Sequence, residues 1–425
     1  MKEHNCLLSL GSFFLTATLV LADSGWQGQV SAQPVEPGPV VATTTSMPAQ
    51  RFYIMSRDPF LKSRFEVRHQ FPTAFSAVLT PREVEALVAR GIAVKPVQIF
   101  HIVPKPGTVC GDGVCEPGEN KNNCPADCNG GDDGNTGARS CYPENPTPWG
   151  IDRMYGDQPD YLPSGGDGVT VAVLDTGVNI NHPDLKNRIR DCKDATKKGG
   201  IKSGCVDNHG HGTHVSGTIL ADGGDDKKGI FGVAPGAGLM AIKVCGNVFC
   251  WGDDIAAGIG YAAGSGANII SMSLGSNLPD SQVLRAIDTA AAKNVMVVAA
   301  AGNDGPAEGS IDYPGAYIKV VAAGAINQSG NVPDWSSRGI NDENCAIEEK
   351  EVEFGAPGVN IESTYNDGCY TYMSGTSMAT PHISGLAAKV WAGDVGSTRS
   401  YLQKLAERVC PTDKATGFGL PTISP

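Results

Sequence analysis

The chain has 425 residues, 54 of them glycine, and charged residues make up only 18% of the sequence, a composition that suits a globular protein of about two to three domains. Its formal net charge of −12 argues against nucleic acid or an anionic membrane surface as a partner, because both are negatively charged. Composition leaves the fold open. No internal repeat is evident.

The N-terminus has the order of a signal peptide. In residues 1–22, Lys2 precedes an apolar run that ends at Ala22, and cleavage is expected there or as late as Ala32. An uncleaved anchor helix is the alternative. Thirteen cysteines include Cys6 in this segment, so an even number remains, as in disulfide-bonded exported proteins. We expect a secreted protein, extracellular or periplasmic.

Residues 23–50 lack periodicity and predict a linker, and residues 51–104 predict a small α+β domain. Thr80, followed by Pro and then by Glu83, has the pattern of a capping box at the start of a helix. Strands are expected over residues 51–55, 74–79 and 92–94.

A cysteine cluster with the spacing C-x4-C-x8-C-x3-C follows at residues 110–128, inside a segment (105–139) that ends in a Gly/Asp-rich hinge. The cluster is too short for an apolar core and therefore predicts a disulfide knot. Metal binding is the rival interpretation, but zinc sites usually contain two C-x2-C pairs.

From residue 140 to 425, nearly continuous apolar strands alternate with helices, which predicts a parallel sheet covered by helices on both faces. The strands are expected at residues 169–174, 239–244, 267–273, 295–300 and 318–323, and the helices at 253–263, at 281–293 and from Ser377 onward.

Three short blocks in this region carry residue types that together support nucleophilic catalysis. Asp175 begins a D-T-G block at the end of an apolar strand, His211 begins H-G-T-H-V-S-G, and Ser377 lies in G-T-S-M-A-T-P-H. A serine needs a base to become a good nucleophile, and the base needs a third group to orient it. In the first turn of a helix, Ser377 would also lie near free backbone N–H groups.

These blocks, in the order Asp, His, Ser, resemble the subtilisin-like serine proteases, a family known for this chain order. The resemblance implies a subtilisin-like α/β fold and an endopeptidase in which Asp175 orients His211, His211 takes the proton of Ser377, and an acyl-enzyme forms. It implies no cofactor for catalysis. We interpret the other histidines of this region as packing residues and not as metal ligands: His182, His209 and His214.

The resemblance also assigns residues that bind substrate. Asn303 would stabilise the oxyanion together with the N–H of Ser377, and Ala301 and Gly302, directly before it, would bind substrate. Ser273, Leu274 and Gly275 would form an exposed strand edge on which a peptide pairs. Asp312 matches the floor of the primary specificity pocket, where a carboxylate would favour Arg or Lys before the scissile bond.

Residues 51–104 are similar to the inhibitory propeptide of the family, a small ferredoxin-like domain. The resemblance therefore implies a zymogen whose partners are peptide substrates and its own propeptide, and we expect a monomer. It also implies a structural calcium ion, because Asp184 matches a family ligand and Asn145 falls near another.

Cysteine spacing favours disulfides between neighbours, Cys192–Cys205 and Cys245–Cys250. Proximity and elimination alone then suggest Cys345–Cys369 and Cys141–Cys410.

Two other functions fit part of the sequence. One is a protease-shaped binding protein that acts through the cysteine knot, against which the intact residues at 175, 211, 303 and 377 argue. The other is an esterase with the same triad, but the G-x-S-x-G elbow of such enzymes is absent around Ser377.

Overall fold

The computed structural model describes residues 50–102, 141–158, 162–342 and 344–423, and these belong to one compact unit that spans residues 49–425. The predicted signal peptide, the knot and the hinge lie outside the described residues, as does the predicted linker apart from Gln50. No helix in the described part of the chain is long and apolar enough to span a bilayer.

The predicted parallel sheet lies at the centre, with eight strands in the order β15-β14-β13-β11-β6-β9-β7-β8. Each neighbouring pair is parallel except β7–β8, which is antiparallel. Every residue of β9, β13 and β14 is buried, because these strands are covered on both faces. The strands are β6 (Thr170–Asp175), β7 (Ile189–Asp194), β8 (Lys202–Ser203), β9 (Gly238–Lys243), β11 (Ile269–Met272), β13 (Met296–Ala300), β14 (Val320–Ile326) and β15 (Phe354–Pro357).

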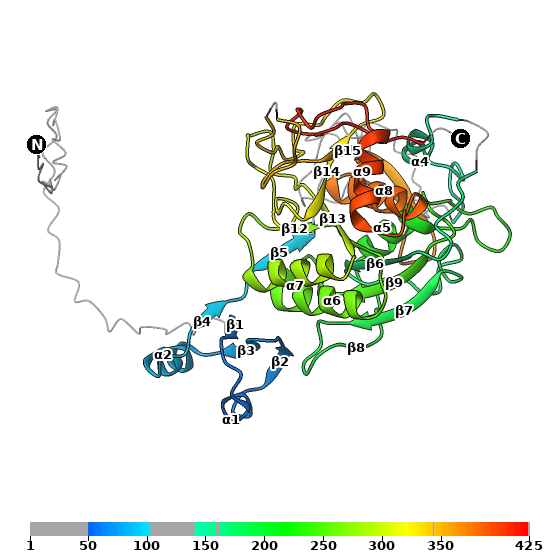
Figure 1. The fold of residues 1–425 in the computed structure, drawn as a ribbon. Helices are drawn as coiled ribbons and strands as arrows, with labels where there is room; N and C mark the ends of the chain where they lie inside the picture. Colours follow the sequence, from blue (N-terminus) through cyan, green and yellow to red (C-terminus); the bar gives the residue numbers. More distant parts are fainter. Residues whose placement is uncertain (1–49, 103–140, 159–161, 343, 424–425) are drawn as a thin grey trace, which may run out of the picture. The chain divides into compact units, whose positions relative to one another are not determined.

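Helices cover the two faces of this sheet (Figure 1). On one face lie α5 (His211–Leu220) and α8 (Thr376–Lys389), whose apolar side chains pack with those of β6, β13 and β14. On the other face lie α6 (Gly252–Gly264) and α7 (Ser281–Ala292), which enclose a second apolar core. The fold therefore has three layers, as the sequence predicts.

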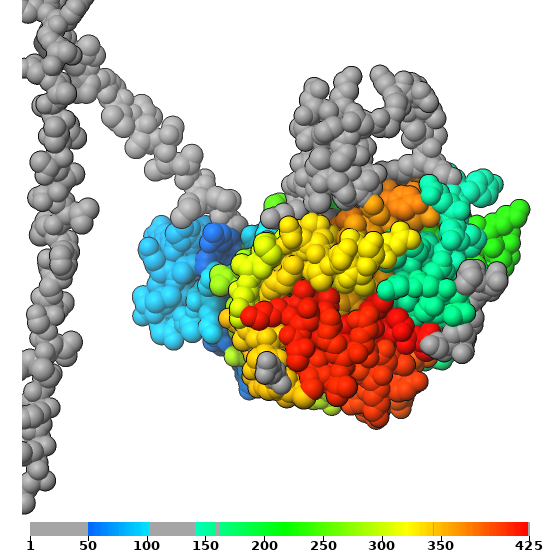
Figure 2. All heavy atoms as spheres, turned by 90° about the horizontal axis from the view of Figure 1, so that it is seen from above, coloured from blue at the N-terminus to red at the C-terminus, as the bar shows by residue number. Residues whose placement is uncertain are grey.

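The C-terminal segment packs on the edge of the sheet. After α9 (Val395–Leu405), the chain runs beside β15, where Gly355 N–H donates to the carbonyl of Gly419. Ile423 N–H then donates to the carbonyl of Met154 at the end of α4 (Trp149–Met154). Figure 2 shows this segment in red on the molecular surface.

Residues 50–96, which we call the N-terminal lobe, form a four-stranded antiparallel sheet in the order β2-β3-β1-β4. Thr80 and Glu83 form the predicted capping box at the start of α2, and both hydrogen bonds of the box are present. The lobe has its own small apolar core. Its elements are β1 (Gln50–Ile54), α1 (Pro59–Lys62), β2 (Val67–Gln70), β3 (Phe75–Leu79), α2 (Pro81–Ala89) and β4 (Val94–Pro96).

The strand that follows the lobe, β5 (Ile99–Ile102), leaves that sheet and lies between two short strands of the main domain. One is β10 (Phe249–Trp251) and the other is β12 (Leu274–Gly275), and β5 is antiparallel to both. A separate hairpin joins β16 (Ile361–Thr364) to β17 (Tyr370–Met373).

Two of the four expected disulfides are correct, Cys192–Cys205 and Cys245–Cys250. The other two pairings were wrong, because the structure joins Cys141 to Cys369 and Cys345 to Cys410. The segment after Cys141 lies along β16, where Glu144 N–H donates to Glu362 and the Trp149 ring N–H donates to the Asn360 carbonyl. This places Cys141 beside the β16–β17 turn that contains Cys369.

Candidate active site

Asp175 is the last residue of β6, at the edge where parallel strands end and side chains become available for chemistry. Its carboxylate is buried, and Oδ1 accepts a hydrogen bond of 2.7 Å from Thr176 N–H. The same oxygen lies 2.8 Å from Nδ1 of His211. Within the described part of the chain, Oδ2 has no hydrogen-bond partner.

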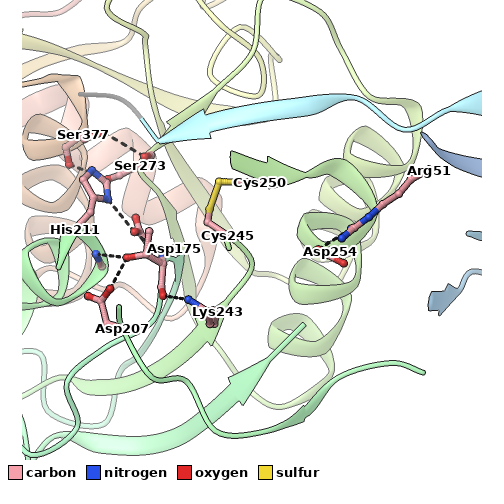
Figure 3. Close-up of a disulfide and its surroundings, with 12 residues drawn as sticks. Arg51, Asp175, Asp207, His211, Lys243, Cys245, Cys250, Asp254, Ser273 and Ser377 are labelled. Carbon is pink, nitrogen blue, oxygen red and sulfur yellow. Dashed lines mark hydrogen bonds and ion pairs between the residues drawn. A yellow bond between two sulfur atoms is a disulfide. The ribbon is translucent and has the colours of Figure 1, made fainter. Parts of the chain in front are cut away.

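His211 is the first residue of α5 and is also buried. The preceding Gly210 has φ 102°, and a Cβ there would lie 2.1 Å from the ring of Tyr365, so only glycine fits this turn. The contact with Asp175 fixes the imidazole, and Nε2 has no partner among the described residues. Figure 3 shows the His211 ring between Asp175 and Ser377, with Nε2 toward the serine.

Ser377 is the second residue of α8, where backbone N–H groups are not used by the helix. Its Oγ–H donates to the carbonyl of Ser273 at 3.2 Å, and Ser273 Oγ–H donates back to the Ser377 carbonyl at 2.7 Å. The Ser377 carbonyl has no donor within the helix, because Pro381, four residues later, has no N–H. Ser273 therefore fixes the candidate nucleophile in two ways.

Asn303 lies close to the serine, just after β13. Its Oδ1 accepts from Thr376 N–H at 3.0 Å and from Thr376 Oγ1–H at 2.9 Å, so the amide is held by the residue next to Ser377. With its oxygen occupied, the side chain presents its NH2 group as a donor. Thr376 Oγ1 also accepts from Gly302 N–H at 3.2 Å.

A second buried carboxylate, Asp207, lies between the turn after Asp175 and the start of α5, and the sequence analysis assigned it no role. Its Oδ1 accepts from Thr176 Oγ1–H at 2.9 Å, and its Oδ2 accepts from Thr213 Oγ1–H at 2.6 Å. Burial alone would raise the pKa of Asp207, but hydrogen bonds from Thr213, Gly210 and His209 hold it below its usual value. Asp207 thus joins the turn after Asp175 to the helix that begins at His211. An acidic residue four positions before the predicted base, His211, is the sequence feature that could have indicated this role.

Lys243 is a buried cation beside these carboxylates, at the end of β9 opposite Asp175. Its ammonium donates to the carbonyl of Thr176. Burial lowers the pKa of Lys243, while the charges of Asp207, Asp194 and Asp175 oppose that shift. A lysine at the end of an otherwise apolar strand is the sequence feature that could have indicated a buried charge near the site.

Two of the histidines predicted to be packing residues, His182 and His214, make structural hydrogen bonds. His214 Nε2 lies 2.8 Å from the Ile361 carbonyl, and burial lowers its pKa to about 3. His182 Nε2 lies 3.1 Å from the Cys369 carbonyl, and burial lowers its pKa as well. Burial, followed by the nearby His211, lowers the pKa of His209.

The strand edge expected at Ser273, Leu274 and Gly275 is present but not exposed here. Leu274 is opposite Ile102 and Gly275 is opposite His101, so β5 of the same chain pairs with it. On its other side β5 pairs with β10, which sequence reasoning missed because it has only three residues. We call the space between β10 and β12, which β5 fills, the groove.

Asp312 lies between two backbone segments that border the candidate site. A Cβ at Gly275 would lie 2.6 Å from Asp312 Oδ2, and one at Gly302 would lie 2.7 Å from it. The residue is only 5% exposed, and Oδ1 has no partner among the described residues. Burial, and then the charge of Asp304, raises the pKa of Asp312 to about 7.

The two predicted calcium ligands lie in different surroundings. Asp184 is buried, and its Oδ2 accepts at 2.8 Å from both Ile230 N–H and Tyr370 OH. Burial raises its pKa, and the hydrogen bonds from Tyr370 and Ile230 oppose that shift. Such a carboxylate fits a bound cation. Asn145 instead accepts from Thr147 N–H at 3.1 Å, and no hydrogen bond between described residues joins it to Asp184.

Comparison with known proteins gives the family of the chain. The model of the Subtilase family matches residues 166–415. Over 260 residues the chain is 47% identical to the subtilisin of Bacillus sp. (strain TA39), an alignment that covers 58% of this chain and 62% of the relative, less than two thirds of its length. It is 41% identical over 244 residues to subtilisin Savinase of Lederbergia lenta, covering 57% of this chain and 83% of that protein.

Two solved structures are also similar. Sphericase has 43% sequence identity and a TM-score of 0.63, and the match covers 66% of this chain and 99% of that one. The S41 psychrophilic protease has 41% identity and a TM-score of 0.62, with 68% and 100% covered. The chain therefore belongs to the Subtilase family.

Proposed function

We propose that this protein is a secreted serine endopeptidase made as a zymogen. Ser377 Oγ attacks the peptide carbonyl while His211 Nε2 accepts its proton, and Asp175 stabilises the imidazolium that forms. His211 then gives the proton to the leaving amine, and water hydrolyses the acyl-enzyme. Asn303 and the N–H of Ser377 bind the oxyanion.

The observation that carries this proposal is the placement of the His211 ring. Its Nδ1 is 2.8 Å from Asp175, which leaves Nε2 without a partner on the side of Ser377 (Figure 3). Asn303, held by Thr376, adds an amide donor at the same place. Disulfides support export, since they persist in oxidising compartments.

Cleavage of a denatured protein tests the assignment. The mature protein should cut it, and the Ser377→Ala protein should not. A Ser377→Ala protein that still cuts at the wild-type rate would exclude the assignment.

Two sets of contacts made by residues 50–102 support an inhibitory propeptide. Their strand β5 occupies the groove between β10 and β12, as an extended peptide substrate would. Arg51 also pairs with Asp253 and Asp254 of α6 at 2.9 and 2.8 Å. We therefore interpret the N-terminal lobe with β5 as an inhibitor that is released on maturation.

Arg or Lys before the scissile bond would suit the buried carboxylate of Asp312. The unpaired Oδ1 is an acceptor without a donor, and a basic side chain would supply one. The test compares peptides that differ only in Arg or Phe at that position. Arg peptides should be cut faster by the wild type, and Asp312→Asn should remove the preference. Faster cleavage of Phe peptides by the wild type would contradict it.

A structural calcium ion at Asp184 is the remaining part of the proposal. The buried carboxylate would hold it through oxygen, with no part in the chemistry. Chelation with EDTA should lower the melting temperature of the wild type, and calcium should restore it. Asp184→Asn should respond much less, and an equal response of both proteins would argue against this site.

A further inference from the structure

The disulfide Cys245–Cys250 closes a short loop, residues 245–250, between the triad and the substrate groove. Val244 and Cys245 donate backbone N–H bonds of 2.9 and 3.2 Å to the carbonyl of Asp175, so the loop starts at the triad aspartate. It ends in β10, and both cysteines are fully buried. Figure 3 shows the disulfide between Asp175 and the strands of the groove.

The far side of this loop contacts the strand that occupies the groove. Val248 accepts a hydrogen bond of 3.1 Å from Ile102 N–H, and the rings of Phe249 and His101 lie 5.2 Å apart, edge to face. Cys250 itself is paired with Phe100. The loop and β10 thus form one wall of the groove, and β12 forms the other.

The wall formed by β10 depends on its partner strand. In the sheet order β10-β5-β12, β10 is an edge strand next to β5, and its other backbone pairing among the described residues is the bridge between Cys245 and Cys250. When β5 leaves, β10 keeps that short bridge and its connection to α6, and so short a hairpin is marginal in water without a covalent link. The Cys245–Cys250 disulfide limits the conformations that residues 245–250 can adopt once β5 has left.

We propose that Cys245–Cys250 is a specificity-determining staple that keeps β10 in place as the second wall of the substrate groove, so that the enzyme binds peptides extended over several residues before the scissile bond. This inference rests on the proposed protease function. Replacing the cysteines by alanine removes the cross-link but keeps the backbone N–H groups that donate to the Asp175 carbonyl. Loss of the staple should therefore affect long substrates more than short ones.

The experiment compares two double variants of the mature enzyme, Cys245→Ala/Cys250→Ala and, as a matched control, Cys192→Ala/Cys205→Ala. The control removes another short-range disulfide, which joins β7 to the residues after β8. The Cys205 carbonyl accepts from Val178 N–H just after Asp175, so the control also loses a disulfide near the triad, but on a segment that does not pair with β5. Each enzyme is given a tetrapeptide p-nitroanilide and an N-acetyl ester of the same final amino acid. The ratio of the two kcat/KM values measures the contribution of the extended groove.

The ratio should fall at least tenfold in the Cys245→Ala/Cys250→Ala enzyme, through KM, and stay within twofold in the control. An unchanged ratio, or equal losses on both substrates, would overturn the proposal. A wild type that cuts neither substrate would instead refute the protease function on which the proposal rests. If the wild type cuts both substrates, the protease function holds and the ratio alone decides the proposal.

If the double variant does not fold, the wild type is reduced stepwise with dithiothreitol, which becomes its cyclic disulfide as two cysteine thiols form. Alkylation and peptide mapping then identify the open pair. The ratio should fall as Cys245–Cys250 opens and not as Cys192–Cys205 opens. A fall that follows Cys192–Cys205 alone would overturn the proposal.

Discussion

At the scale of single residues, the candidate nucleophile is positioned by a neighbour that takes no part in proton transfer. Ser273 donates to the Ser377 carbonyl, which Pro381 cannot reach with a hydrogen bond of its own. Ser273→Ala would leave this buried carbonyl unsatisfied, at a cost of about 1–3 kcal/mol. Denaturant unfolding in a Ser377→Ala background measures it. Ser329→Ala, at an exposed position, should change stability little, and equal effects of the two substitutions would contradict this role.

Asp312 makes stability depend on pH. Its carboxyl has a usual pKa of 3.8 but a pKa of about 7 in the folded protein, so the folded state holds the proton between these values. The contribution of Asp312 to stability is therefore present below about pH 4 and is lost as pH rises to 7. The difference amounts to roughly 4 kcal/mol at most.

Asp312→Asn removes this dependence. In a Ser377→Ala background, the substitution should raise the melting temperature more at pH 8 than at pH 4. Thermal unfolding at both values checks it, and the same change at both would argue that the carboxyl is not protonated in the fold.

At the scale of elements, the acidic start of α6 is matched to basic residues of the N-terminal lobe. Asp253 and Asp254 lie in the first turn, where the helix dipole favours negative charge, and both are buried under the lobe. Arg68 and His69 reach the same pair, with His69 Nε2 2.8 Å from Asp254. His69, Asp253 and Asp254 could together hold a metal ion by geometry, but guanidinium groups already neutralise the carboxylates.

Arg51→Met should therefore loosen the lobe. Removing one partner of a buried ion pair costs on the order of 3 kcal/mol, so release of the lobe should become about a hundredfold faster. The time course of maturation of the full chain measures it. Lys198→Met is the control, because the Lys198–Glu66 pair is 63% and 71% exposed. If both variants mature at the wild-type rate, the ion pairs do not hold the lobe.

At the scale of the whole molecule, the disulfides should differ in their effect on stability. Cys141–Cys369 spans 228 residues and Cys245–Cys250 spans only 5. Loop-closure entropy predicts losses of roughly 5 and 2 kcal/mol when each pair is replaced by alanine. Unfolding of the two double variants, each with Ser377→Ala, tests the ranking. A larger loss for Cys245–Cys250 would show that chain entropy is not the controlling term.

The sequence predicted the parts of this protein that local patterns specify. The apolar strands, the Thr80 capping box and the short-range disulfides were correct, because each depends on residues near one another in the chain. The pairing of Cys141 was wrong, because contacts between distant segments decide which cysteines meet.

Around the candidate site, Asp175, His211 and Ser377 were predicted as a triad from their blocks, whereas no role was predicted for Asp207 or Lys243. Their roles come from strand register and from hydrogen bonds to the Thr176 turn, which the sequence alone does not display. The strand β10 was also missed, because a strand of three residues is too short to show the alternation of apolar and polar side chains.

The most direct test of the central claim is chemical labelling of the mature protein with an organophosphonate, followed by peptide mass spectrometry. The account predicts one covalent adduct, on Ser377, and its loss in the His211→Ala protein, whose serine has no base. Absence of an adduct, or an adduct on another serine, would contradict the assignment of Asp175, His211 and Ser377 as the catalytic residues.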